Sequence, residues 1–123
     1  MKEKYLNGKG ELDYDYKHDI LFFKTTERSY KKSIELDNIV LDIDSEGFIV
    51  GIQIFEASKF LGLPKLSLRK VPRWEFIAKV DEGRIEIRLV FKTMIRNKII
   101  ENRPIIVGPV KEPLPNSELI VRV

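Results

Sequence analysis

The sequence predicts a mainly β fold of the α+β class, in which an antiparallel β-meander with one short helix precedes a second β-rich unit. Residues 39–54 alternate apolar and polar side chains at the two-residue period of a strand, and a turn interrupts them. Residues 74–92 repeat this arrangement around a turn of similar composition. Between the two hairpins, Gly62 and Pro64 disfavour any continuous element. We therefore expect two β units that pack against each other.

The first unit is expected at residues 1–63. Its first ten residues are polar and include Gly8 and Gly10, which predicts a weakly held start. Residues 20–23 are all apolar and predict a strand that is covered on both faces. Gly47 provides the hairpin turn with a residue that readily adopts a positive φ. The strands expected in this unit are residues 11–17, 20–23, 33–36, 39–44 and 48–55.

Residues 56–61 have the composition of a short helix, which Gly62 ends as a C-cap residue. We expect this helix to pack on the sheet through Phe60 and Leu61. The second unit is then expected to span residues 64–123.

The second unit is expected to be a further β-meander. Alternate residues from Trp74 onward are apolar, and the strand that starts at Arg84 repeats the alternation, so these faces predict a core. Residues 94–103 fit either a bent strand or a helical turn. Residues 104–110 lie between prolines, which predicts an edge strand. Residues 119–123 are too apolar for an exposed end and are expected beside an interior strand.

Composition limits the classes of protein to consider. The chain has 123 residues, of which 43% are apolar and 33% charged, as in a single folded domain or two small units. No apolar run approaches the roughly 18 residues of a membrane span, and no apolar run follows the first lysines as in a secretory signal. The chain has no cysteine, which excludes disulfides and thiolate metal sites. These features predict a cytoplasmic protein.

The net charge of +3 is unevenly distributed. Residues 1–63 carry 9 basic and 12 acidic side chains, whereas residues 64–123 carry 13 and 7. One interpretation is that the two halves attract each other, or that the arginines lie on an ordinary solvated face. The other interpretation is a basic surface for an acidic partner. The residues of that possible basic surface are Arg69, Arg73, Arg84, Arg88 and Lys92. With Trp74 they resemble the components of a single-strand nucleic-acid site, although the spacing of Trp74 favours the core.

No residue pattern predicts catalysis. His18 is the only histidine, and its polar setting favours an exposed turn. Asp42 and Asp44 fall on the same face of a strand, roughly 7 Å apart, and offer a cation site or acid–base pair, but also suit a solvated sheet face. No serine lies in a nucleophile motif, and Gly8 and Gly10 do not form a phosphate-binding loop. We therefore predict no catalytic, cofactor-binding or metal-binding residue.

Over residues 11–61 the sequence resembles a small prokaryotic family known as domain of unknown function 2283. The matching positions are Tyr14, Asp15, Asp19, Leu21, Asn38, Ile39, Leu41, Asp42, Ile43, Asp44, Gly47, Ile49, Gly51, Ile52, Ile54, Ala57 and Ser58. Tyr16 departs from the family, which often has proline there. The resemblance implies a short β-meander with one terminal helix, and it implies no activity or cofactor. It also points to pairing with small toxin-like proteins.

We therefore predict a non-enzymatic binding or regulatory module that acts through protein–protein contact, including an antitoxin-like role; a nucleic-acid-binding protein with a basic face is the alternative. The apolar runs at residues 20–23, 105–107 and 119–121 exceed what one small subunit is expected to bury. A homodimer is therefore expected, together with a protein partner of unknown identity and no membrane association.

Overall fold

The computed structural model describes residues 4–26, 28–69, 71, 73–109 and 113–122 of the chain. Its strands are β1 (Lys4–Asp15), β2 (Ile20–Thr25), β3 (Tyr30–Leu36), β4 (Ile39–Asp44), β5 (Ile49–Ile54), β6 (Trp74–Asp81), β7 (Arg84–Ile95), β8 (Lys98–Asn102), β9 (Ile105–Pro109) and β10 (Ser117–Arg122). Two short helices, α1 (Ala57–Leu61) and α2 (Lys65–Arg69), lie between β5 and β6. The predicted mainly β class with few short helices is confirmed.

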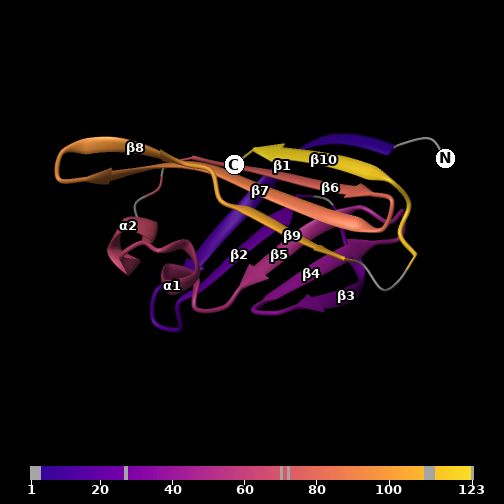
Figure 1. Ribbon diagram of the computed structural model, residues 1–123, viewed down its shortest axis with the longest axis horizontal. Coiled ribbons are helices and arrows are strands. Elements are labelled where there is room, and N and C mark those ends of the chain that lie inside the picture. The colour runs from indigo at the N-terminus through magenta and orange to yellow at the C-terminus, as the bar shows by residue number, and fades with distance from the viewer. Residues whose placement is uncertain (1–3, 27, 70, 72, 110–112, 123) are drawn as a thin grey trace.

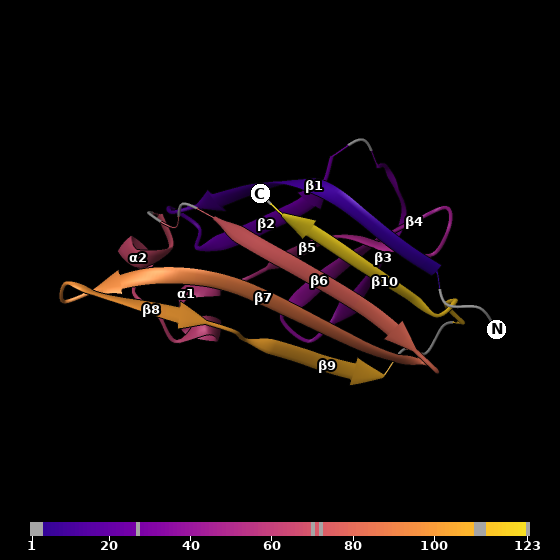
Figure 2. The ribbon, with the colours of Figure 1, turned by 90° about the horizontal axis from the view of Figure 1, so that it is seen from above.

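The strands form one curled sheet in the order β3-β4-β5-β2-β1-β10-β6-β7-β8, with β9 also paired to β7. The sheet folds over on itself into two layers (Figure 1). One layer contains β3, β4, β5 and β2, and the other contains β10, β6, β7, β8 and β9, which lie side by side in the view from above (Figure 2). β1 belongs to both layers, because residues 4–9 pair with β10 in parallel and residues 10–15 pair with β2 in antiparallel orientation.

Gly10 marks the point at which β1 passes from one layer to the other. A Cβ atom at this position would lie 2.5 Å from Cγ1 of Val121 and 2.8 Å from Cζ of Phe23. Side chains from both layers therefore occupy the space beside the backbone. Glycine permits this close approach because it has no side chain.

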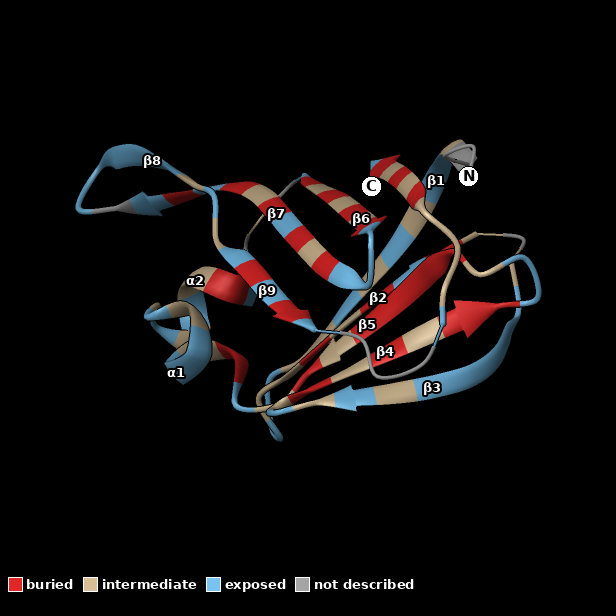
Figure 3. Ribbon diagram, turned by 45° about the vertical axis from the view of Figure 1, so that its right-hand side comes forward, coloured by how far each residue is buried: buried red, intermediate tan, exposed pale blue. Residues whose placement is uncertain are grey.

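The core lies between the two layers. Buried residues alternate with half-buried or exposed ones along β6 and β7, as the stripes in Figure 3 show. The stacked rings of Phe23 and Phe76, whose centroids are 4.5 Å apart, join the layers. Trp74 is 3% exposed and its ring lies 4.1 Å from that of Phe91, so the predicted core position of Trp74 is confirmed.

Several local predictions are also confirmed. Gly47 adopts a φ of 90° in the first hairpin turn, and Gly62 caps α1 with a φ of 68°. β10 lies between β1 and β6, as expected for so apolar a segment. The ambiguous residues 94–103 form the end of β7 and all of β8, joined by a two-residue turn at residues 96 and 97 in which φ is 50° and 64°. Positive φ at both positions is typical of a type I′ hairpin.

Other predictions were wrong. Residues 1–10 were expected to be weakly held, but residues 4–10 belong to the strand β1; residues 1–3 lie outside the described part of the chain. A second helix, α2, follows Pro64, whose carbonyl accepts a hydrogen bond from the Ser67 amide at 3.0 Å. Proline suits a first helical turn as well as it ends a helix. Phe60 is 43% exposed and does not pack on the sheet; Ala57 is the buried residue of α1, and Leu61 packs against the core as expected.

The apolar segment at residues 20–23 is covered on one face only. Leu21 and Phe23 are buried between the layers, whereas Ile20 and Phe22 are half-exposed on the outer face. None of the helices in the described part of the chain is long and apolar enough to cross a membrane.

Candidate interaction surfaces

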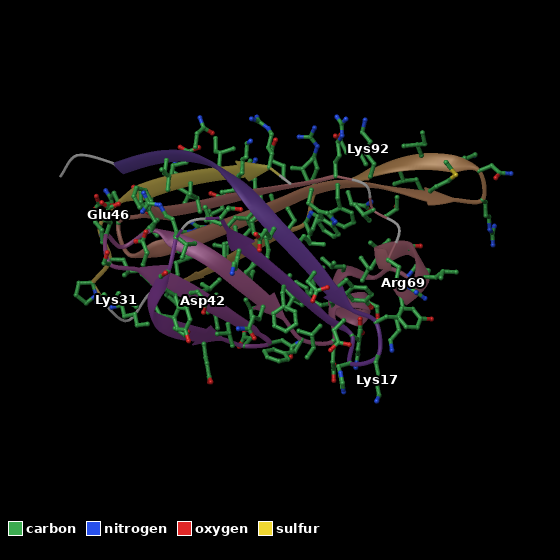
Figure 4. All side chains as sticks on the ribbon, turned by 180° about the vertical axis from the view of Figure 1, so that it is seen from behind. Lys17, Lys31, Asp42, Glu46, Arg69 and Lys92 are labelled. Atoms are coloured by element: carbon green, nitrogen blue, oxygen red, sulfur yellow. The ribbon has the colours of Figure 1, made fainter. Side chains whose placement is uncertain are left out.

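The predicted basic residues divide between two places. Arg84, Arg88 and Lys92 recur every four residues along β7, so all three project from its outer face. Arg73 lies just before β6. Arg69 belongs to α2, where its guanidinium lies 4.7 Å from the centre of the Tyr16 ring. Figure 4 shows Lys92 on the outer face of the sheet and Arg69 beside the helices. The structure therefore brings together four of the five predicted residues and separates Arg69 from them.

Acidic side chains interrupt this basic face. A groove of about 270 Å³ is lined in part by Arg73, Lys92 and Arg122. Glu75 lines the same groove, and its Oε2 atom lies 3.0 Å from Nε of Arg122. Trp74 is buried and leaves no exposed ring for stacking on a base. The face is therefore mixed in charge.

The same outer face also carries an apolar surface, because Met94 is opposite Ile99 and Arg88 is opposite Ile105. It lies at the β7–β8 hairpin, which projects beyond the layers in Figures 1 and 2, and continues along β9. The exposed fractions in this region are Met94 66%, Ile99 68%, Ile100 42%, Ile105 51% and Val107 45%. We call the outermost part, residues 98–109, the β8–β9 edge. Ile100 projects from the other face, and Glu101 and Arg103 separate Ile99 from Ile105 on the outer one. Exposed apolar groups that gather on one element often mark an interaction site.

The β8–β9 edge behaves as one strand. Asn102 of β8 is opposite Phe91, and Ile105 of β9 is opposite Arg88, so the register along β7 is unbroken between them. The amide of Leu89 donates a hydrogen bond to the carbonyl of Pro104 at 3.2 Å, which fills the gap. Because the register is continuous, odd-numbered residues from Ile99 onward share one face.

The hydrogen bond between Leu89 and Pro104 also fixes the direction in which the backbone groups along this edge point. The carbonyl of Pro104 points toward β7, and successive residues of a strand point in opposite directions. Arg103 and Ile105 therefore direct their N–H and C=O groups away from β7, as do Glu101 and Ile99. Pro104 lacks an N–H group only on the side of β7, so it does not blunt the outer side of the edge.

The opposite edge of the sheet, β3, is better protected. Lys31, Lys32 and Glu35 are exposed along it, and β3 is mostly blue in Figure 3. Charged side chains on an edge strand discourage pairing with other chains. The β8–β9 edge combines the exposed apolar Ile99, Ile105 and Val107 with the exposed charged residues Lys98, Glu101 and Arg103.

A polar cluster joins α1 to the turn between β1 and β2. The carboxylate of Asp19 accepts hydrogen bonds from the hydroxyl of Tyr14, and from the amide and the hydroxyl of Ser58 at 3.0 and 2.6 Å. Partial burial acts to raise the pKa of Asp19, but the hydrogen bonds from Ser58 and Tyr14 outweigh it and lower this pKa below its usual value. Burial and the bond to Asp19 raise the pKa of Tyr14 well above its usual value. All three groups already have partners, so the cluster holds the fold together.

The remaining candidates from the sequence, His18, Asp42 and Asp44, also have hydrogen-bond partners. The ring of His18 lies in an exposed turn, 2.8 Å from the carboxylate of Asp15. Asp42 accepts a hydrogen bond from Ser33 at 2.9 Å, whereas Asp44 binds the guanidinium of Arg28 and the amide of Phe48.

Asp42 and Asp44 do not present a common site. They were predicted to share a strand face, but the pairing of β4 with β5 shifts register between Asp42 and Ile43, and Asp44 is buried. Among the residues described, no group of three or more acidic or histidine side chains is arranged to hold a metal ion.

Comparison with known proteins finds a matching protein family and two similar proteins. Residues 11–58 match the family described as protein of unknown function (DUF2283). An uncharacterized protein of Methanocaldococcus jannaschii is 31% identical over 115 residues, which cover 92% of this chain and 98% of that protein. A protein of Methanosarcina mazei named putative hypoxanthine phosphoribosyltransferase is 35% identical over 91 residues, or 74% of each chain. No solved structure gives a significant match.

Proposed function

Because the chain belongs to the family of unknown function (DUF2283), we propose that it is a non-enzymatic binding or regulatory module that acts through protein–protein contact. The exposed β8–β9 edge is the observation that carries this proposal. It combines backbone groups that pair with no other strand in the described part of the chain with apolar side chains such as Ile99 and Ile105. A strand of a partner protein added at this edge would pair with the backbone groups and cover the apolar side chains.

The contrast between the two edges of the sheet supports the same conclusion. β3 carries the exposed Lys31 and Lys32, which discourage an edge strand from pairing, whereas the outer face of the β8–β9 edge has Ile99, Ile105 and Val107 beside the ion pair of Glu101 with Arg103. An unprotected apolar edge makes a protein prone to aggregation unless a partner covers it. A small toxin-like protein is one class of partner to look for.

The enzyme named for the relative from Methanosarcina mazei is not part of this proposal. Phosphoribosyl transfer requires a site for a pyrophosphate group, which proteins commonly build from a glycine-rich turn that leads into a helix. In the described part of the chain each helix has only five residues, and neither follows such a turn. The Asp19 carboxylate at the start of α1 is already bound by the hydroxyls of Ser58 and Tyr14.

Capture experiments with matched variants test the proposal. The tagged protein, Ile99→Lys and Tyr30→Lys are each incubated with lysate of the source cells, with and without nuclease. Tyr30 is 62% exposed on β3, so its replacement removes a similar apolar group from the other edge. We expect the wild type and Tyr30→Lys to capture the same proteins despite nuclease, and Ile99→Lys to lose them. Equal capture by Ile99→Lys would contradict the proposal.

Nucleic-acid binding is the alternative function. The row of Arg84, Arg88 and Lys92 favours it, because these cations are spaced along one exposed face. Glu75 and Glu86, which pair with Arg122 and Arg88, reduce the positive charge of that face. Capture that nuclease abolishes, and that Arg88→Glu weakens while Ile99→Lys does not, would favour this alternative.

A further inference from the structure

The β8–β9 edge is complementary to itself. Its outer face presents, in order, Ile99, Glu101, Arg103 and Ile105. Ile99 and Ile105 are equally far from Asn102 along the edge, and so are the oppositely charged Glu101 and Arg103. We propose that this edge pairs with the same edge of a second copy of the chain, antiparallel, with the two-fold axis at Asn102. This inference rests on the proposed function and names the partner at that site.

The pairing that results is favourable at each position. Ile99 lies opposite Ile105 of the second copy, and Glu101 lies opposite Arg103 of the second copy; symmetry repeats both pairs. All four residues direct their backbone groups outward, so each pair exchanges two backbone hydrogen bonds. Glu101 and Arg103 already lie 3.0 Å apart within one chain, and both are exposed, so they can reach each other across the axis.

Neighbouring registers are less favourable. Moving the two-fold axis by one residue along the edge shifts the strand pairing by two residues. A shift of two residues keeps the same face of each strand outward, so these are the only neighbouring registers to compare. An axis at Arg103 places Arg103 opposite its own copy, and an axis at Glu101 places Glu101 opposite its own copy. Like charges directly opposite each other destabilise a sheet. The axis at Asn102 is therefore the one that pairs opposite charges.

The first test is a charge exchange. Light scattering over a concentration series is expected to give the wild type a dimer mass that dissociates on dilution. Glu101→Arg and Arg103→Glu each place like charges opposite each other twice, so each is expected to raise the dissociation constant roughly tenfold or more. The double variant is expected to restore the dimer.

Glu86 and Arg88 provide a matched control. They form an equally spaced, exposed ion pair at 2.9 Å on the adjacent strand β7. Glu86→Arg and Arg88→Glu change the same charges but leave the dimer as in the wild type. An unrestored dimer in the double variant at positions 101 and 103, or an equal loss in the controls, would overturn the proposed register.

The second test uses the absence of cysteine from the chain. Mild oxidation of an equal mixture of Ile99→Cys and Ile105→Cys is expected to yield a disulfide-linked heterodimer, because facing strand residues lie within disulfide distance. A mixture of Ile99→Cys and Val107→Cys belongs to the neighbouring register and is expected to remain unlinked. Preferential linkage of the second mixture would refute an axis at Asn102.

The outcomes separate this inference from the proposed function. A wild type that remains monomeric at every concentration, with no cross-link, overturns pairing with a second copy. The proposed function then depends on the capture experiment, in which other proteins still bind in a manner that requires Ile99. Loss of both results overturns both.

Discussion

Asp19 connects two segments that lie far apart in the sequence. It adopts a φ of 56°, a left-handed conformation in which aspartate is more readily found than most residues. Its carboxylate binds Tyr14 on β1 and Ser58 on α1, while its carbonyl accepts a hydrogen bond from the Ala57 amide at 2.9 Å. One side chain thus fixes where the first helix begins.

We expect Asp19→Asn to lower the free energy of unfolding by about 1–3 kcal/mol, because the amide cannot accept all the bonds that the carboxylate accepts. Urea unfolding at neutral pH measures the loss. Asp15→Asn is the control, since Asp15 binds only the exposed His18 turn and its replacement should cost clearly less. Equal losses would show that the Asp19 contacts are not special.

The same substitution has a predictable pH dependence. The pKa of Asp19 is lowered in the folded state, so its contribution to stability is complete above its unfolded pKa of about 3.9. This contribution is lost as the pH falls through the lowered pKa. The difference in unfolding free energy between the wild type and Asp19→Asn should therefore shrink below about pH 4. A difference that stays constant down to acid unfolding would contradict this assignment.

Tyr14 should resist ionisation. Burial and the Asp19 carboxylate raise its pKa, so its neutral form is favoured by folding, fully so below the ordinary tyrosine pKa of about 10. In an alkaline titration followed by tyrosinate absorbance, Tyr14 should ionise in a late step, above the ordinary tyrosine pKa. Tyr14→Phe should remove this late step. A late step that survives Tyr14→Phe would assign it elsewhere.

At the scale of elements, the change of layer along β1 depends on Gly10. Gly10→Ala should destabilise by about 1–3 kcal/mol, because the added methyl group meets Val121 and Phe23 at distances that require the core to move. Gly8→Ala on the same strand is the control, since its nearest contact would be an ordinary 3.4 Å from Cγ2 of Thr25. Urea unfolding should separate the two variants, and similar midpoints would refute the crossing at Gly10.

The sequence predicted individual strands better than it predicted which strands pair with each other in the sheet. The alternation along β6 and β7 is local, so it identified both strands and placed Trp74 in the core. The pairing of β2 with β5, and of β1 with β10, depends on packing between distant segments and left no local signal. Pro64 was interpreted as a stop, although it also begins α2.

The candidate surfaces were predicted to a similar extent. The four-residue spacing of Arg84, Arg88 and Lys92 shows in the sequence that they share a strand face. The prolines around residues 104–110 correctly indicated an edge. The continuity of β8 with β9 could not be predicted, because it depends on how both strands align along β7.

At the scale of the whole molecule, the fold is expected to be independent of divalent ions. Asp42 and Asp44 bind Ser33 and Arg28 rather than facing a common cavity. Excess chelator should leave the melting temperature unchanged. A large decrease that one divalent ion reverses would contradict this expectation, and Asp42→Asn would then show whether that carboxylate is the ligand.

The parallel pair of β1 and β10 has a consequence for the order in which the protein is completed during synthesis. Residues 4–9 are synthesised long before residues 117–122, the strand β10 with which they pair. Until those residues emerge, neither the first half of β1 nor β6 has the neighbour that β10 provides between them. Contacts this far apart in sequence slow folding. The nascent chain therefore has to keep two unpaired strand edges from other proteins until residues 117–122 emerge.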